Sequence, residues 1–227
     1  MPISDKKHWS AKSDLKHDEL KDAVEVALEW VLANRAQAAG ILAGIVVATA
    51  VASVAVYARR ARRDAAWNDL IAAESDAGEG KIADAQPLIA RAQAGGGGAA
   101  VQTMARLLDG DLRYASGQYD LALDSYQKAA ESAPENLRGY ALADQVQTLA
   151  AAGKADRCVS SAQSFIDNRS GDLLAPLVLS TMARCQSDEG QAAAAQATYQ
   201  KIALMYPQTP WADMAEARLT ATKAKTN

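Results

Sequence analysis

Hydrophobic and polar positions divide the chain into one uncharged apolar run and a longer stretch with helical periodicity. The run from Ala36 to Ala58 contains 23 residues without a charged side chain. About 20 predominantly apolar residues are enough for a helix to cross the core of a bilayer. A cleaved signal peptide has a shorter apolar region near a basic start, whereas 35 mostly polar residues precede this run. The pattern therefore predicts an uncleaved transmembrane helix over 36–58.

The polar tail, residues 1–35, is predicted to contain an amphipathic helix. Apolar residues recur at helical spacing from Leu20 to Leu32, and charged residues between Lys21 and Glu29 occupy the other side. This arrangement places Trp30 near the membrane interface. The helix is either a surface-docking element or a solvated helix that leads into the span.

Small residues recur every four positions along the predicted span. Spacing of this kind lets two helix backbones approach closely in lipid, and the first pair forms a Gly-x-x-x-Gly motif. The candidate helix-packing residues are Gly40, Gly44, Ala48 and Ala52. The alternative is that an alanine-rich chain produces such a stripe by chance.

Beyond the span, helical segments alternate with glycines. The segment 59–98 is predicted to contain a helical linker and a first helical pair. The glycines Gly95–Gly98 within it are predicted to form a flexible connector. They do not form a phosphate-binding loop, because no Gly-Lys-Ser/Thr follows them. Further along, Gly117, Gly153 and Gly190 lie 36 and 37 residues apart. This period predicts helix–turn–helix units that stack, because one unit cannot bury its apolar face alone.

Residues at fixed distances from these glycines define the repeat. Small residues stand at the predicted helix crossings, large ones on the core side, and a proline closes the first and third units. The repeat-defining positions are Gly110, Gly117, Tyr119, Ala122, Tyr126, Ala129, Pro134, Gly190, Ala195, Tyr199 and Pro207.

These residues resemble the tetratricopeptide repeat, most closely over Gly117–Pro134. The middle unit departs from it, since Cys158 replaces the usual alanine and no proline closes the unit. The resemblance implies an all-α solenoid of helical hairpins over 99–227, with a final helix near Thr209–Leu219 that covers its open end. It also implies that ligands meet the concave face made by the first helices. Candidate groove residues are Arg106, Arg113, Arg138, Gln145 and Arg184.

Composition excludes several function classes. The net charge of −3 argues against nucleic acid as a partner, and the basic cluster Arg59–Arg63 beside the span suits lipid headgroups. The only histidines, His8 and His17, lie in the tail, and neither Gly-x-Ser-x-Gly nor Cys-x-x-Cys occurs. We therefore expect no catalytic constellation, no metal site and no cofactor, and a protein that is not an enzyme.

The two cysteines lie in helices expected to be antiparallel neighbours. Cys158 belongs to the second helix of one unit and Cys185 to the first helix of the next. Their thiols could face each other and form a disulfide in an oxidising compartment. Otherwise both are small buried core residues.

The order of the parts is similar to that of bacterial proteins in the ancillary SecYEG translocon subunit family. The tail motif over Leu15–Glu19, one span, and a small repeat domain carry this resemblance. It implies a single-pass protein of the bacterial inner membrane, with a cytoplasmic N-terminus and periplasmic repeats. Its partners would be the Sec translocon, periplasmic chaperones or unfolded clients.

The charges beside the span favour the opposite orientation by a narrow margin. Four arginines follow the span, whereas Lys16, Lys21 and Arg35 precede it. The alternatives are therefore a cytoplasm-facing scaffold, or a structural subunit of an inner-membrane complex that pairs through the small-residue face.

Overall fold

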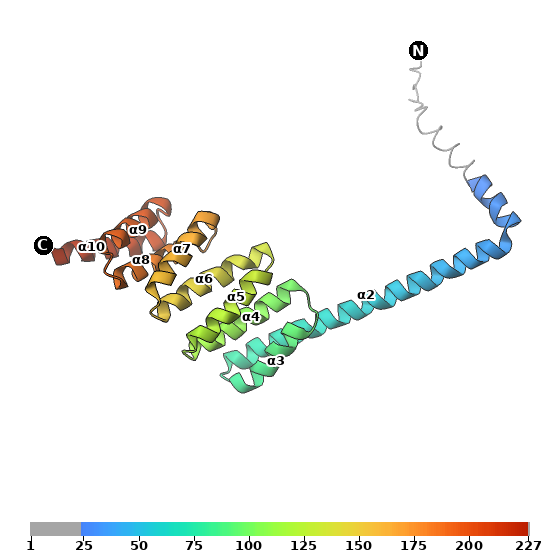
Figure 1. The fold of residues 1–227 in the computed structure, drawn as a ribbon, viewed down its shortest axis with the longest axis horizontal. Coiled ribbons are helices and arrows are strands. Elements are labelled where there is room, and N and C mark those ends of the chain that lie inside the picture. The colour runs from blue at the N-terminus through green and yellow to red at the C-terminus, as the bar shows by residue number, and fades with distance from the viewer. Residues whose placement is uncertain (1–23, 227) are drawn as a thin grey trace, which may run out of the picture. The chain divides into compact units, whose positions relative to one another are not determined.

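A computed structural model describes residues 24–226, with side chains up to residue 221, and every regular element in that range is an α-helix (Figure 1). The predicted all-α class is confirmed. The tail motif at Leu15–Glu19, both histidines and the start of the predicted amphipathic helix lie outside the described residues. The chain divides into two units, Met1–Ala58 and Arg59–Asn227, which are described separately.

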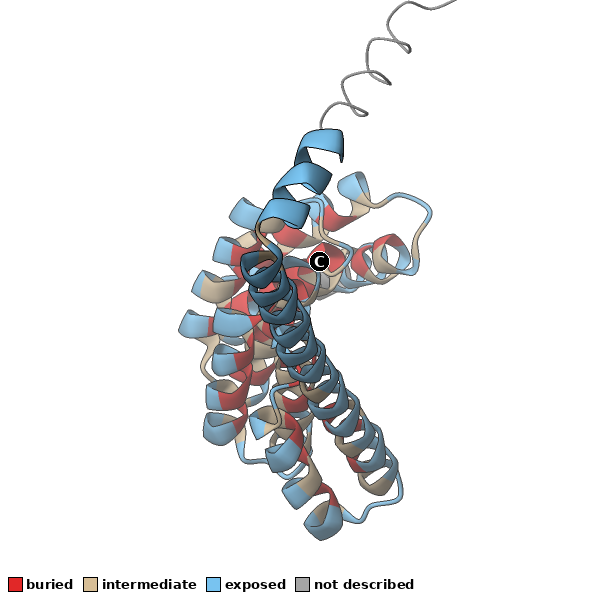
Figure 2. Ribbon diagram, turned by 90° about the vertical axis from the view of Figure 1, so that its right-hand side faces the viewer, coloured by how far each residue is buried: buried red, intermediate tan, exposed pale blue. Residues whose placement is uncertain are grey.

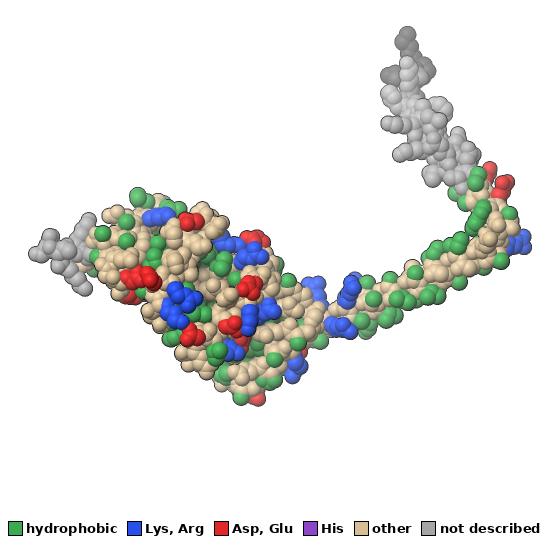
Figure 3. All heavy atoms as spheres, viewed as in Figure 1, with side chains coloured by type: hydrophobic (Ala, Val, Ile, Leu, Met, Phe, Trp, Pro, Cys, Tyr) green, Lys and Arg blue, Asp and Glu red, His purple; other side chains and the backbone are tan. Residues whose placement is uncertain are grey.

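The first unit contains one candidate membrane span. Residues 24–33 are helical, and α2 then extends over Arg35–Gly78. An 18-residue window of α2 has a mean hydropathy of 2.4, and none of it is buried. On the face drawn in Figure 3, hydrophobic side chains and no charged ones lie along this helix between the basic groups near its start and those farther on. By length and composition this helix can cross a membrane.

Gly40 and Gly44 lie on this exposed helix, and a side chain added at either would meet nothing within 4 Å. The small-residue face therefore has no neighbour within the part of the chain that the structure describes. Whether it pairs with another helix stays a prediction.

The second unit is built from consecutive antiparallel helices. Each helix packs against the next, and α4 also contacts α6, α6 contacts α8, and α8 contacts α10. After the end of α2, the helices are α3 (Ile82–Ala94), α4 (Ala99–Ala115), α5 (Tyr119–Ser132), α6 (Glu135–Ala151), α7 (Ala155–Arg169), α8 (Ala175–Asp188), α9 (Ala192–Met205) and α10 (Pro210–Thr226).

The same glycine turn joins the two helices of each pair. Gly80, Gly117, Gly153 and Gly190 have φ angles of 77°, 71°, 67° and 76°, a left-handed conformation that glycine adopts without steric cost. At each turn the residue after the glycine donates its backbone N–H five residues back, as Gln118 does to Arg113 at 2.8 Å. This is a Schellman motif, and it satisfies carbonyls that the helix end leaves free. Gly80 was not among the turn glycines identified from the sequence.

Equivalent positions around the turn glycines are buried in all pairs. Five residues after each glycine stand Ala85, Ala122, Cys158 and Ala195, and seven residues before stand Ala73, Gly110, Val146 and Ala183. The first helical pair, made by the end of α2 and by α3, therefore follows the same pattern as the later ones. Figure 2 shows the buried residues on the faces where the helices of the second unit pack together.

Two buried clusters hold the helices of the second unit. One joins α2, α3 and α4 through Leu70, Ile89 and Val101; the other extends from α6 to α10 around Phe165 and Leu179. The glycine connector between α3 and α4 takes part in the first. A side chain at Gly97 would lie 2.8 Å from the Cβ of Ala66, so glycine is needed for this close approach.

Candidate functional site

Three rows of residues recur on the first helix of each pair, and together we call them the first-helix face. Their members are exposed or half-buried, except for the buried Thr181. Counted back from the turn glycine, the rows lie thirteen, nine and six residues before it. The thirteenth-residue row is Trp67, Met104, Tyr140 and Leu177; the ninth is Ile71, Leu108, Asp144 and Thr181; the sixth is Glu74, Asp111, Gln147 and Arg184. A further step of 37 residues leads to Met214, Arg218 and Ala221 of α10.

A hollow of about 560 Å³ brings these rows together at the C-terminal end of the second unit. Its wall is formed by α6, α8, α9 and α10. Row members in this wall are Gln147, Leu177, Thr181, Arg184, Met214 and Arg218. The Ser180 hydroxyl lies 3.8 Å from the sulfur of Met214, so α8 and α10 are in direct contact beneath the hollow. Equivalent positions on α6, α8 and α10 thus share one surface.

A second hollow, of about 610 Å³, lies between α6 and α7. Its lining is more polar, with serines of α7 facing Arg138 and Gln145 of α6. Phe165 and Leu142 supply its apolar part.

The structure does not bring the five candidate groove residues together. Arg184 lines the first hollow, and Arg138 and Gln145 line the second. Arg106 donates hydrogen bonds to the Lys128 carbonyl and to a serine hydroxyl of α5, and Arg113 forms an ion pair with Asp109 of its own helix at 2.8 Å.

Arg138 has a structural task in addition to its place in the second hollow. Its guanidinium donates to the carbonyls of Ala130 at 3.2 Å and Ala133 at 3.0 Å, and it pairs with Glu135 at 3.1 Å. A cation at the C-terminus of a helix satisfies carbonyls there and interacts favourably with the helix dipole. Arg138 therefore fixes the passage from α5 to α6.

Two carboxylates of the first-helix face were missed from the sequence. The Tyr126 hydroxyl donates to Asp111 at 2.6 Å, and burial together with this hydrogen bond raises the pKa of Tyr126. Burial also raises the pKa of Asp144 to about 7, and the nearby charge of Asp111 adds to the rise. Acidic residues on helices usually indicate a face in contact with water. Asp111 and Asp144 differ from other acidic residues because they occupy row positions of the first-helix face, and this position could have identified them from the sequence.

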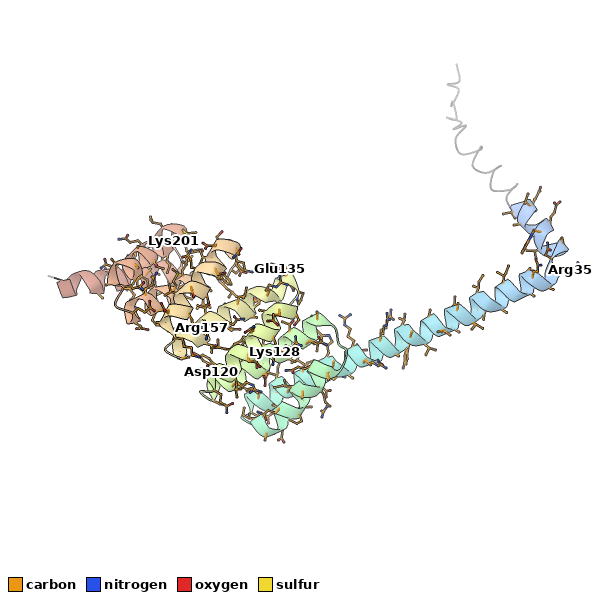
Figure 4. All side chains as sticks on the ribbon, in the orientation of Figure 1. Arg35, Asp120, Lys128, Glu135, Arg157 and Lys201 are labelled. Carbon is orange, nitrogen blue, oxygen red and sulfur yellow. A yellow bond between two sulfur atoms is a disulfide. The ribbon has the colours of Figure 1, made fainter. Side chains whose placement is uncertain are left out.

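Several charges on the second helices form ion pairs. Lys154 pairs with Asp120 and lowers the pKa of that carboxyl, and Asp124 pairs with Lys128 at 2.6 Å. Figure 4 shows Asp120 near Arg157, whose charge acts in the same direction. Arg184, by contrast, has no ion-pair partner among the described residues.

Cys158 of α7 and Cys185 of α8 form a disulfide in the structure. Their Cα atoms lie 6.3 Å apart, and both side chains are fully buried. The bond joins the second helix of one pair to the first helix of the next.

Tyr119 packs edge-on against Tyr114 across the turn at Gly117, with ring centroids 5.5 Å apart. Pro134 immediately precedes α6, and Pro207 lies between α9 and α10. Both prolines thus stand where one pair ends and the next helix begins.

Among residues 24–226, no group of three or more His, Cys, Asp or Glu side chains is arranged to hold a metal ion. Comparison with family models, curated proteins and solved structures finds no match to this chain.

Proposed function

We propose that this protein is a membrane-anchored adaptor whose helical pairs form a tetratricopeptide-like solenoid with a protein-binding groove. The observation that carries the proposal is the convergence of equivalent positions on α6, α8 and α10 at one hollow. Repeated contacts between alternate helices, with the same turn in every pair, are the features expected of a stacked solenoid. In such a stack the first-helix face is the concave, ligand-binding side.

The apolar part of α2 supplies the membrane anchor. Large side chains such as Leu42, Val47 and Val54 are more than half exposed, which is costly in water and favourable in lipid. Anchoring raises the effective concentration of the groove near other proteins of the same membrane. Weak groove contacts are then sufficient for association.

The repeats face the periplasm in this proposal, and the partners are the Sec translocon and the chaperones that receive emerging chains. The resemblance of the tail, span and repeats to ancillary SecYEG subunits supports this assignment. The buried disulfide supports the orientation, because disulfides persist in oxidising compartments and are rare in the cytosol. The four arginines after the span favour the reverse orientation, which makes it the first point to test.

Site-specific photocrosslinking in intact cells tests the groove. A photoreactive amino acid replaces Leu177, in the wall of the first hollow, and a matched one replaces Lys201, an exposed residue of α9 outside it. We expect translocon or chaperone adducts from position 177 and none from position 201. Equal adducts from both positions, or adducts without any translocon or chaperone component, would contradict the proposal.

Labelling from one side of the membrane tests the orientation. In Lys201→Cys the native cysteines are bonded to each other, so the new thiol is the reactive one. A membrane-impermeant maleimide should label it in cells with a permeabilised outer membrane and an intact inner membrane. Labelling only after the inner membrane is disrupted would place the repeats in the cytoplasm.

A further inference from the structure

We infer that the groove accepts an extended protein segment with basic residues at one end, acidic residues at the other and apolar side chains between. This inference rests on the proposed function, because it specifies the class of segment that the first-helix face binds. Its basis is a change in the sign of charge along that face.

The face is acidic toward α2 and basic toward α10. The sixth-residue row reads Glu74, Asp111, Gln147 and Arg184 in the order of the helices. The ninth-residue row adds Asp144 on α6 and, one repeat beyond Thr181, Arg218 on α10. Both rows therefore change from negative to positive across α6 and α8.

Contacts show that these charges share one surface. Helix α4 packs against α6, and α6 packs against α8, so Asp111, Asp144 and Arg184 stand on neighbouring first helices. Gln147 of α6 lines the same hollow as Arg184 and Arg218. Asp188 also lines that hollow, which leaves two cations and one anion around it. Along the order of the first helices, the acidic residues of α4 and α6 are thus followed by the basic ones of α8 and α10.

A row of apolar residues accompanies this change of charge. The thirteenth-residue row carries Trp67, Met104, Tyr140 and Leu177, and Met214 extends it onto α10. Tyr140 is 50% exposed although it is large and apolar. Packed helix axes lie about 8–10 Å apart, and a segment in the polyproline II conformation advances about 3.1 Å per residue with three residues per turn. Every third side chain of such a segment lies on one face, about 9 Å from the next, so one apolar side chain can meet each first helix.

The charges decide which occupant fits. A segment that is acidic throughout meets Glu74, Asp111 and, above about pH 7, the ionised Asp144. One that is basic throughout meets Arg184 and Arg218. Complementary potentials attract the matching partner, and like charges placed together disfavour the wrong one. A segment of mixed sign, laid with its acidic end on α8 and α10, satisfies both halves.

Binding of synthetic peptides to the full chain in a non-ionic detergent tests this inference. One labelled peptide carries lysines at one end, aspartates at the other and leucine at every third position between. A second has the same composition with the charges interleaved. We expect the first to bind about fivefold to tenfold more tightly, and salt to reduce the difference.

The same charge reversal on a first helix and on a second helix provides a test and its matched control. Arg184→Glu should weaken binding of the first peptide by about tenfold, because it replaces an attraction by a repulsion. Lys201→Glu makes the same change on α9 outside the hollow and should leave binding unchanged. Asp111→Asn should weaken binding by a few fold while it keeps an acceptor for Tyr126.

Several outcomes would overturn the inference. These are equal affinity for the two peptides, no binding of either, or the same loss in the two charge-reversal variants. Concentration-dependent self-association that Arg184→Glu abolishes would assign the groove to a second copy of the chain instead. If position 177 still crosslinks to translocon or chaperone components in cells while the peptides are not discriminated, the charge pattern is irrelevant and the adaptor function stands.

Discussion

Gly110 shows how closely α4 and α5 approach each other. A Cβ atom added at this position would lie 2.4 Å from the ring of Tyr126, which is almost fully buried. The ring is held in place, because its hydroxyl donates a hydrogen bond to Asp111 at 2.6 Å. Glycine is thus required here by packing, on a helix where alanine would otherwise be favoured.

Gly110→Ala should destabilise the protein. Overpacking costs about 1–3 kcal/mol, which exceeds the gain of about 0.5–1 kcal/mol from helix propensity. We expect a lower midpoint of urea unfolding, followed by circular dichroism of the full chain in detergent. The matched control is Gly78→Ala, where an added Cβ meets nothing within 4 Å. A midpoint unchanged in Gly110→Ala would show that α4 and α5 separate easily.

Asp144 should make stability depend on pH. Its pKa is raised from 3.8 to about 7, so between these values the folded state holds a proton that the unfolded state has lost. The free energy of unfolding is therefore highest with respect to this group below the unfolded pKa, and it falls as the pH rises from there toward 7.

Asp144→Asn removes this dependence. The variant should be more stable than the wild type at about pH 8 and similar to it near pH 4, as measured by urea unfolding at both values. Glu216→Gln, a change to an exposed carboxylate of α10, serves as the control and should show no such pattern. A wild type no less stable at the higher pH than the variant would contradict the raised pKa.

At the scale of the elements, each helix pair depends on its neighbours. The hydrogen-bonded glycine turn fixes the two helices of a pair, but the buried clusters extend over several pairs. Between α7 and α8 the disulfide adds a covalent link to this packing.

Loss of the disulfide should lower the stability of the second unit. The bonded cysteines are 27 residues apart, and closing a loop of this length stabilises by about 3–4 kcal/mol in the chain-entropy description. Urea unfolding with and without a reductant measures the effect. The variant with both Cys158→Ala and Cys185→Ala should be as unstable as the reduced protein and insensitive to the reductant. A reductant-sensitive double variant would show that the reductant acts elsewhere.

At the scale of the whole molecule, the two units differ in how far their large apolar side chains are exposed. Large apolar side chains of the candidate span are exposed, whereas those of the second unit are mostly buried or half-buried. By length and composition the first unit holds a helix that can cross a membrane, whereas the second has buried clusters of its own.

Val47→Arg should reduce integration into the membrane. Val47 lies at the centre of the apolar run, where arginine costs about 2.5–3.5 kcal/mol on insertion scales. We expect a larger fraction to be extracted by alkaline carbonate. The control is Leu173→Arg, at a residue of the second unit that is 92% exposed. Equal extraction of the variant and the wild type would argue against a membrane span.

Helix positions and turns could be predicted from the sequence, because glycine and small residues have specific backbone and packing roles. The turns at Gly117, Gly153 and Gly190 follow from this. Gly80 was missed because Ala85 and Ala92, which follow it at the repeat positions, have no distinctive neighbours in an alanine-rich chain.

The candidate site was harder to predict. Arginine side chains are long, and periodicity alone does not show that Arg106 and Arg138 turn toward helix ends while Arg184 lines the hollow. The pairing of Asp111 with Tyr126 likewise depends on how far α4 and α5 are offset. Such offsets follow from packing between helices, which the pattern of one helix does not contain.

The disulfide also determines how the second unit would respond to mechanical force. A pull on the two ends of the chain would unravel the helices on either side of the bridge but could not extend the residues between Cys158 and Cys185. The two cysteines are 27 positions apart in the sequence, and full extension of the chain between them would otherwise add roughly 90 Å. The bridge thus acts as a covalent stop, and beyond it α7 and α8 keep a local structure from which the neighbouring helices can re-form.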